Sequence, residues 1–189
     1  MIQKFNQYNE SLRDKMVGIT TDDLDDLPDE KINDKFLESA IIFGYLDGVK
    51  RYVDIKLKNG EDIPVEKNLD EAIYYNHLDI VKYLLDTFDS FVLDKKANVE
   101  LRIATYTGNL DMIKYFVEEK GMPINDKSYS LLQIAIKNGH KDVTEYFLTK
   151  LSKNDLKNIE IPLTLANPSK YKKLLPYLDE VGIKYTGNR

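Results

Sequence analysis

The chain has no cysteine among its 189 residues. Disulfides and thiolate metal sites are therefore excluded, and the absence suits a reducing compartment. No stretch approaches the ~20 apolar residues of a membrane span, and the opening MIQKFNQYNE lacks the apolar core of a signal peptide. These absences predict a soluble cytoplasmic protein, in its own cell or in a host cell, that does not bind a membrane.

The chain also has no excess of basic residues, since 27 Lys and Arg stand against 32 Asp and Glu and the net charge is −5. Nucleic-acid binding needs a basic face, so we expect no nucleic acid among the partners. No Gly-x-x-x-x-Gly-Lys phosphate loop and no Gly-x-Ser-x-Gly elbow occurs. We therefore expect no enzyme activity, no small-molecule substrate, no cofactor and no metal.

One pattern dominates what is present. The motif Leu-x-x-Ala occurs five times, and its alanines are separated by 32, 32, 31 and 31 residues. The five copies are Leu37/Ala40, Leu69/Ala72, Leu101/Ala104, Leu132/Ala135 and Leu163/Ala166. A period of this length indicates one helical unit repeated, each copy burying its apolar face against the next.

The residues after each alanine predict a second helix in every unit. An aspartate follows seven positions later in four copies, and a glycine follows four positions later in three: Asp47, Asp79, Asp111 and Asp142; Gly44, Gly108 and Gly139. Glycine supplies the positive φ that ends a helix. Aspartate in the next first turn meets the positive end of the helix dipole. The unit is therefore helix, tight turn, helix.

The blocks GNLDMIKYFVEEKGMPIN (Gly108 to Asn125) and NGHKDVTEYFL (Asn138 to Leu148) resemble the ankyrin repeat family. The resemblance covers about residues 35 to 180 and implies an all-α solenoid of stacked helix-turn-helix repeats. Of the family's Thr-Pro-Leu-His start only the leucine remains. Gly121 to Leu132 spans 11 residues and Gly60 to Leu69 only 9. We therefore expect short or absent β-hairpin fingers.

Three regions are predicted. Residues 1–35 form a leader or cap, with a helix from Ile2 to Met16 and an acidic stretch in which Thr20 or Thr21 caps a short helix. Residues 36–160 hold four repeats. Residues 161–189 form a degenerate capping repeat, distorted because Pro168 and Pro176 interrupt helical hydrogen bonding.

The two histidines could be interpreted as catalytic and a group of aspartates as a calcium site, but we favour neither interpretation. His77 and His140 both lie five residues after their alanines, so a role in stabilising the turn is favoured over catalysis. The aspartates between Asp22 and Asp26 lack the glycine and closing glutamate of a calcium loop. They indicate a solvated acidic face.

The tyrosines fall into two sets. Tyr83, Tyr115, Tyr146 and Tyr177 each lie eleven residues after an alanine, and this constancy predicts packing between repeats. The positions two and three after each alanine vary instead, and by resemblance to ankyrin proteins they face the concave groove. These predicted partner-binding residues are Ile42, Phe43, Tyr74, Tyr75, Tyr106, Thr107, Lys137 and Asn138, ringed by Glu38, Asp70, Glu71 and Arg102.

Exposed aromatics are typical of interface hot spots, and the alternative is that these side chains fill space left by the shortened fingers. The favoured function is a non-catalytic protein-interaction module. The Lys-, Asn-, Ile- and Tyr-rich composition also resembles ankyrin proteins of large DNA viruses, which implies a host or defence protein as partner.

Two other functions stay open. Leu27-Pro28-Asp29-Glu30 resembles the opening of an F-box, which implies a ubiquitin-ligase adaptor. We favour instead Pro28 as the first residue of the helix that leads into Leu37. A structural role, such as a virion component or an oligomeric scaffold, is the third possibility.

Overall fold

The structure is a computed structural model. It describes residues 27–89, 91–95, 98–124, 130–152, 159–163 and 167–186. The predicted leader helix, the threonine cap and the aspartates up to Asp26 lie outside these residues. The chain divides into two compact units, Met1–Phe91 (unit 1) and Val92–Arg189 (unit 2). Within the described ranges, no helix has the length and apolar character to cross a membrane.

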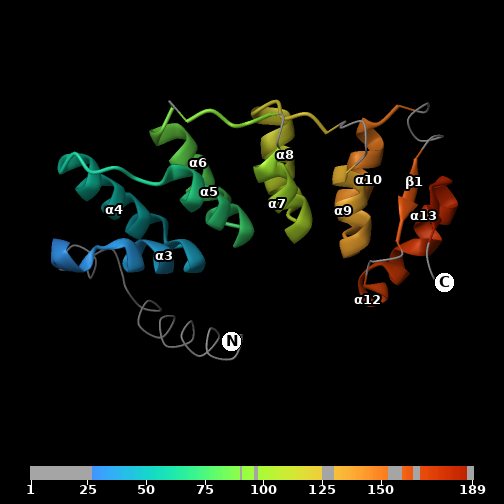
Figure 1. The fold of residues 1–189 in the computed structure, drawn as a ribbon, viewed down its shortest axis with the longest axis horizontal. Coiled ribbons are helices and arrows are strands. Elements are labelled where there is room, and N and C mark those ends of the chain that lie inside the picture. Colours follow the sequence, from blue (N-terminus) through green and yellow to red (C-terminus); the bar gives the residue numbers. More distant parts are fainter. Residues whose placement is uncertain are drawn as a thin grey trace. The chain divides into compact units, whose positions relative to one another are not determined.

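Unit 1 contains two helix pairs. A short 3-10 helix, η1 (Asp29–Lys31), precedes α3 (Asp34–Phe43) and α4 (Leu46–Lys58), and α5 (Val65–Tyr74) and α6 (Leu78–Thr87) follow. Helix α3 packs on α4 and α5 packs on α6, while α3 also contacts α5 and α4 contacts α6 (Figure 1). First helices thus form one layer and second helices another, as stacked repeats require.

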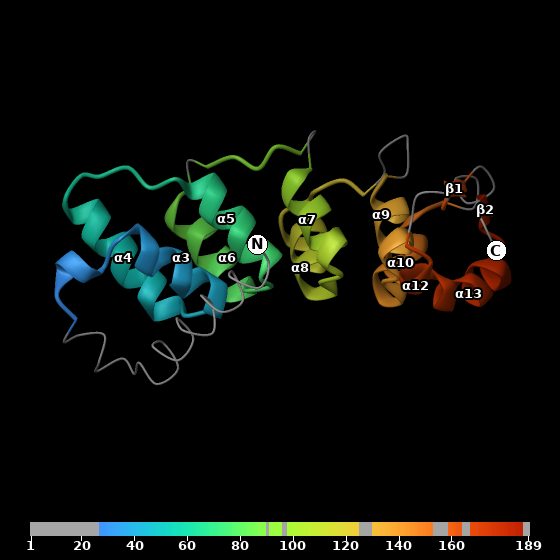
Figure 2. The ribbon, with the colours of Figure 1, turned by 60° about the horizontal axis from the view of Figure 1, so that its bottom comes forward.

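Unit 2 continues the pattern with α7 (Val99–Thr107), α8 (Leu110–Lys114), α9 (Ser130–Asn138) and α10 (Lys141–Lys150). The second helix of its first pair widens into a π-helical turn, η2 (Tyr115–Glu119). First helices again pack on one another, α7 on α9 and α9 on α12 (Pro168–Tyr171), as Figure 2 also shows for the orange and red helices.

The helix boundaries follow the predicted chemistry. Gly44 and Gly108 end α3 and α7 with φ of 72° and 80°. The four aspartates predicted in the second helices all lie in a first turn. In the second repeat Asn76 takes the place of glycine and adopts φ 68°, which asparagine tolerates better than most residues. The helix-turn-helix prediction is confirmed in all four repeats.

The core is built from the repeated motif. Leu37, Leu69, Leu101 and Leu132 are buried, and so are the alanines three residues after them. Because alanine has no side chain beyond Cβ, the two helices of a repeat can approach closely. The apolar residues of the second helices, such as Ile80, Leu84 and Phe147, complete the buried layer.

Histidines join neighbouring turns. His77 Nε2 lies 3.1 Å from the Ile42 carbonyl oxygen, and His140 Nε2 lies 2.9 Å from that of Tyr106. A carbonyl only accepts, so Nε2 carries the proton in both rings. Each ring also fills the space over the glycine of the preceding turn, since a Cβ added to Gly44 would lie 2.4 Å from His77 Nδ1. These contacts agree with the turn-stabilising role predicted for the histidines.

The second-helix tyrosines connect successive repeats. Tyr115 is buried. The Tyr146 hydroxyl donates to Glu118 Oε1 at 2.9 Å, and Lys150 Nζ lies 3.1 Å from the same oxygen. Lys141 of the fourth repeat lies over the Tyr177 ring, 5.3 Å from its centroid. These contacts agree with the predicted packing between repeats.

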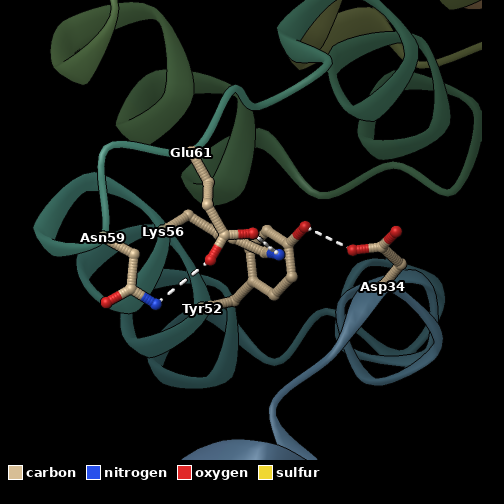
Figure 3. Close-up of polar contacts among 5 residues, drawn as sticks. All are labelled: Asp34, Tyr52, Lys56, Asn59 and Glu61. Carbon is tan, nitrogen blue, oxygen red and sulfur yellow. Dashed lines mark hydrogen bonds and ion pairs between the residues drawn. The ribbon is translucent and has the colours of Figure 1, made fainter.

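A related cluster holds the first repeat together. The Tyr52 hydroxyl donates to Asp34 Oδ1 at 2.7 Å, which ties α4 to the start of α3 (Figure 3). Lys56 lies over the Tyr52 ring and pairs with Glu61, which also accepts from Asn59. Burial, followed by the hydrogen bond to Asp34, raises the pKa of Tyr52 far above its usual range.

Two further predictions, one about Pro28 and one about the loops between repeats, have different outcomes. Pro28 is not the first residue of the helix that carries Leu37. It precedes η1, and α3 begins at Asp34 because the Asn33 side chain accepts from the amides of Lys35 and Phe36. The described parts of the loops between repeats contain no strand, which agrees with the expectation of short or absent fingers.

The C-terminal region differs from a distorted helix pair. It contains strand β1 (Glu160–Pro162), then α12, the 3-10 helix η3 (Lys172–Leu174), α13 (Leu175–Val181) and strand β2 (Lys184–Thr186). The strands pair in parallel, Glu160 with Lys184 through Pro162 with Thr186.

The fifth copy of the motif therefore does not start a helix. Leu163 is buried, but its amide donates to Thr186 O next to the strand pair, and Ala166 lies outside the described residues. Pro168 and Pro176 fall in the first turns of α12 and α13, where the missing N–H costs nothing. They begin short helices and do not distort a long one.

Candidate functional site

The predicted partner-binding residues are divided between the units. Unit 1 holds Ile42, Phe43, Tyr74 and Tyr75, and unit 2 holds Tyr106, Thr107, Lys137 and Asn138. Tyr74 and Tyr106, at the same repeat position, are each 52% exposed. The other six are half-buried. Each unit thus presents one prominent aromatic at the end of a first helix.

Several of the half-buried residues use their polar groups within the chain. Thr107 Oγ1 donates to the carbonyls of Ile103 and Ala104, both at 3.1 Å. Asn138 Nδ2 donates to Ile134 O at 3.0 Å. The Ile42 carbonyl accepts from His77. These residues finish their helices and turns, which leaves the tyrosines as the groups most available to a partner.

We define the unit 1 face as Glu38 on α3 with Asp70, Glu71, Tyr74 and Tyr75 on or at the end of α5. Asp70 and Tyr74 are four residues apart on α5, as are Glu71 and Tyr75, so two neighbouring columns run along the helix. The two tyrosine rings meet edge to face, with centroids 5.2 Å apart and planes at 84°. This aromatic pair is bordered by carboxylates.

The carboxylates of this face are poorly neutralised. Within the described residues, neither Glu38 nor Asp70 has a hydrogen bond or ion pair, and Glu71 reaches Lys67 Nζ only at 3.8 Å. Burial raises the pKa of Asp70, with repulsion from Glu66 adding to it. Burial also raises the pKa of Glu71, which Lys67 opposes and Glu38 reinforces. The face therefore holds negative charge at a cost to stability.

The unit 2 face has the opposite character. It consists of Arg102, Tyr106, Lys137, Asn138 and Lys170. Lys170 Nζ donates to Asn138 Oδ1 at 3.1 Å and lies 5.8 Å from the centroid of the Tyr106 ring. Arg102 donates to Ser130 Oγ at 3.2 Å. Here the exposed tyrosine already has a cation from its own chain.

The contrast extends to the whole units. Unit 1 contains 11 Lys and Arg against 20 Asp and Glu, a net charge of −9 with histidine neutral. Unit 2 contains 16 against 12, a net charge of +4. The modest overall value of −5 therefore conceals two units of opposite net charge.

Unit 1 also has a pocket of about 560 Å³ away from the tyrosine pair. Its lining comes from the loop before α5, the start of α5 and the chain after α6: Ile63, Pro64, Val65, Glu66, Lys67, Phe88 and Phe91. Most of these side chains are apolar. In the described part of the chain, no three His, Cys, Asp or Glu gather where they could hold a metal ion.

Sequence reasoning missed three of these features. Lys170 lies in the degenerate C-terminal region, 64 residues from Tyr106, so no local pattern connects them. The charge division was open to detection, because counting charges separately for the two halves of the repeat array reveals it. The pocket depends on residues on either side of two helices, which only the tertiary structure brings together.

Comparison with known proteins supports the repeat interpretation. No curated protein matches the chain. A family model described as ankyrin repeats, in three copies, matches residues 69–160. That range begins at Leu69, the leucine of the second Leu-x-x-Ala, and includes the third and fourth copies. The fold is accordingly an all-α stack of ankyrin-type helix pairs, and residues 69–160 carry the match to the ankyrin repeats.

Proposed function

We propose that this chain is a non-catalytic interaction module that binds a partner protein through the exposed ends of its first helices. Ankyrin repeats in general are protein-protein interaction modules, and three of them match residues 69–160. The observation that carries the proposal is the pair Tyr74 and Tyr106. Both are half exposed at one repeat position, while the large apolar side chains around the motif are buried.

The physical reason is the energetics of binding. A tyrosine has few rotatable bonds, so its immobilisation costs little entropy for the area that it buries. Each tyrosine lies at the end of a helix that buried leucine and alanine anchor, so the surface that each unit presents is preformed. A partner therefore gains contact area without paying to order the module.

The test compares affinity purification by the parent chain with that by the double variant Tyr74→Ala/Tyr106→Ala. Leu57→Ala is the matched control, because Leu57 is also 52% exposed but lies on α4, in the layer of second helices. We expect one partner to be recovered by the parent and by Leu57→Ala and lost with the double variant. Circular dichroism should be unchanged in all three.

A partner that the double variant still recovers would refute the proposal. Unfolding of the double variant would also contradict it, since these side chains would then belong to the core. Narrower proposals follow the composition of the sequence. They are a cytoplasmic protein of viral or effector type and a host or defence factor as partner. Recovery of such a factor tests them. Within the described residues, nothing favours the ligase adaptor.

A further inference from the structure

The tyrosines Tyr74 and Tyr106 occupy equivalent positions but have different neighbours. Both lie two residues after the alanine of their repeat, and both are equally exposed. Tyr106 has Lys170 over its ring. Tyr74 meets the ring of Tyr75 edge to face, and Asp70 lies four residues before it on α5. Both sites therefore have an exposed tyrosine ring, but within the described residues only the ring of Tyr106 has a cation from the chain over it.

A lysine over a tyrosine ring is a recurrent arrangement in this chain. Besides Tyr106, the rings of Tyr52, Tyr115, Tyr146 and Tyr177 each have a lysine ammonium 5.1 to 5.5 Å from the centroid. Among the described residues, Tyr74 and Tyr75 have none. Tyr74, the most exposed of the described tyrosines of unit 1, thus lacks the lysine that five other tyrosines have.

Carboxylates surround the Tyr74 and Tyr75 pair: Asp70 lies four residues before Tyr74 on α5, and the charges of Glu71 and Glu38 act on Tyr75. Glu38 and Asp70 lack a hydrogen bond or ion pair within the described residues, and Glu71 has only a long contact to an exposed lysine. Like charges on neighbouring helices repel, so Glu38 and Glu71 weaken the packing of α3 on α5. An added cation relieves this repulsion and meets the negative face of the ring at the same time.

We propose that the unit 1 face, Glu38, Asp70, Glu71, Tyr74 and Tyr75, docks a lysine- or arginine-bearing segment of a partner protein. This inference rests on the proposed interaction function and specifies the chemistry of the partner. The cation lies over Tyr74 with the carboxylates as counter-ions, and the Tyr75 ring packs against the aliphatic stem of the basic residue. The charge of −9 on unit 1 speeds the approach of such a segment.

The probe is a phage-displayed library of random peptides, selected on the full-length chain at physiological salt. The selected peptides are expected to be enriched in Lys and Arg. The best of them is synthesised, and its Kd is measured by calorimetry for the parent and for single variants. Tyr74→Ala should weaken it about five- to tenfold, the range of a partly desolvated cation–π contact. Glu71→Gln should weaken it about threefold and reduce its salt dependence.

Two control variants separate this site from general attraction. Asp54→Asn removes the same charge from unit 1 as Glu71→Gln, but Asp54 is exposed on α4, in the other layer. Leu57→Ala removes a side chain that is as exposed as that of Tyr74 from the same helix as Asp54. Both should leave the Kd within about twofold of the parent value. Equal effects of Asp54→Asn and Glu71→Gln would overturn the proposal, because only the net charge would then matter.

Other results have equally definite meanings. Acidic peptides whose binding depends on Tyr106 would overturn this inference and leave the proposed function standing. Selection of no peptide that depends on either tyrosine would count against both. Light scattering of the parent chain should show a monomer. A dimer that is lost in Tyr74→Ala would assign the face to a second copy of this chain and overturn the partner proposed here.

Discussion

Replacement of Gly44 by alanine tests the contact between neighbouring turns. Gly44 has φ 72°, and a Cβ there would lie 2.4 Å from both Cε1 and Nδ1 of His77. Two costs therefore combine. The first is the left-handed backbone, about 1–2 kcal/mol for an L-residue with a side chain. The second is displacement of the His77 ring from its place over the turn.

The second cost has two parts of its own. Moving the ring breaks the 3.1 Å contact of Nε2 with the Ile42 carbonyl, worth about 1 kcal/mol. Forcing an extra methyl into a packed site costs a further ~1–3 kcal/mol. Gly60 is the control, because it has φ 69° with nothing within 4 Å of an added Cβ. We expect Gly60→Ala to lower the free energy of unfolding by only ~1–2 kcal/mol, through backbone strain. Gly44→Ala should lower it by about 2–4 kcal/mol more.

Urea denaturation followed by circular dichroism measures both variants, and the comparison holds if the slope m is unchanged. A double-mutant cycle then isolates the steric part. In a His77→Ala background, Gly44→Ala should cost no more than Gly60→Ala does in the parent, a coupling of about 2–4 kcal/mol. Equal losses for Gly44→Ala and Gly60→Ala, or an additive cycle, would refute the role assigned to His77.

Three further outcomes follow from the core and the charges. Leu101→Asp buries an unpaired charge and should cost about 4 kcal/mol or more; a thermal melt like that of the parent, or like that of exposed Tyr106→Asp, would contradict the repeat register. Burial raises the pKa of Glu71 above its ordinary value, so the folded state binds the carboxyl proton more tightly than the unfolded state does. The protein therefore loses stability as the pH rises from below the ordinary pKa of a glutamate to above the pKa of Glu71 in the folded state. Glu71→Gln should therefore be more stable than the parent at pH 7, with the difference vanishing below about pH 4 in urea titrations; a constant difference at both pH values would argue against the desolvated carboxylate. Asn68 is 4% exposed and its Nδ2 has no hydrogen bond, whereas the fourth repeat has buried Leu131 at the same position. Asn68→Leu should raise the free energy of unfolding by about 1 kcal/mol, and a loss measured by the same denaturation would mean that the amide is satisfied in solution.

Much of the fold was open to prediction because each repeat is a local object. The Leu-x-x-Ala register, the glycine at the end of the first helix and the aspartate in the next first turn act within a few residues of one another. Positions such as Leu37 and Asp142 therefore fell where their spacing placed them. Prediction was wrong at Pro28, because Asn33 sets the start of the helix that carries Leu37. It was also wrong about Pro168 and Pro176, which begin short helices, and it did not include the parallel strand pair between residues 160 and 186.

The sequence alone determined the repeat period, the class of fold and the positions whose variation suggests binding. It did so because helix periodicity and turn chemistry are short-range. The tertiary structure decided which of those positions are free: it placed Lys170 over Tyr106, used Thr107 and Asn138 to finish helices, and left Tyr74 beside unneutralised carboxylates. Thr107 and Asn138 bond within one helical turn, but Lys170 and Tyr106 are 64 positions apart, and no local rule relates those two residues.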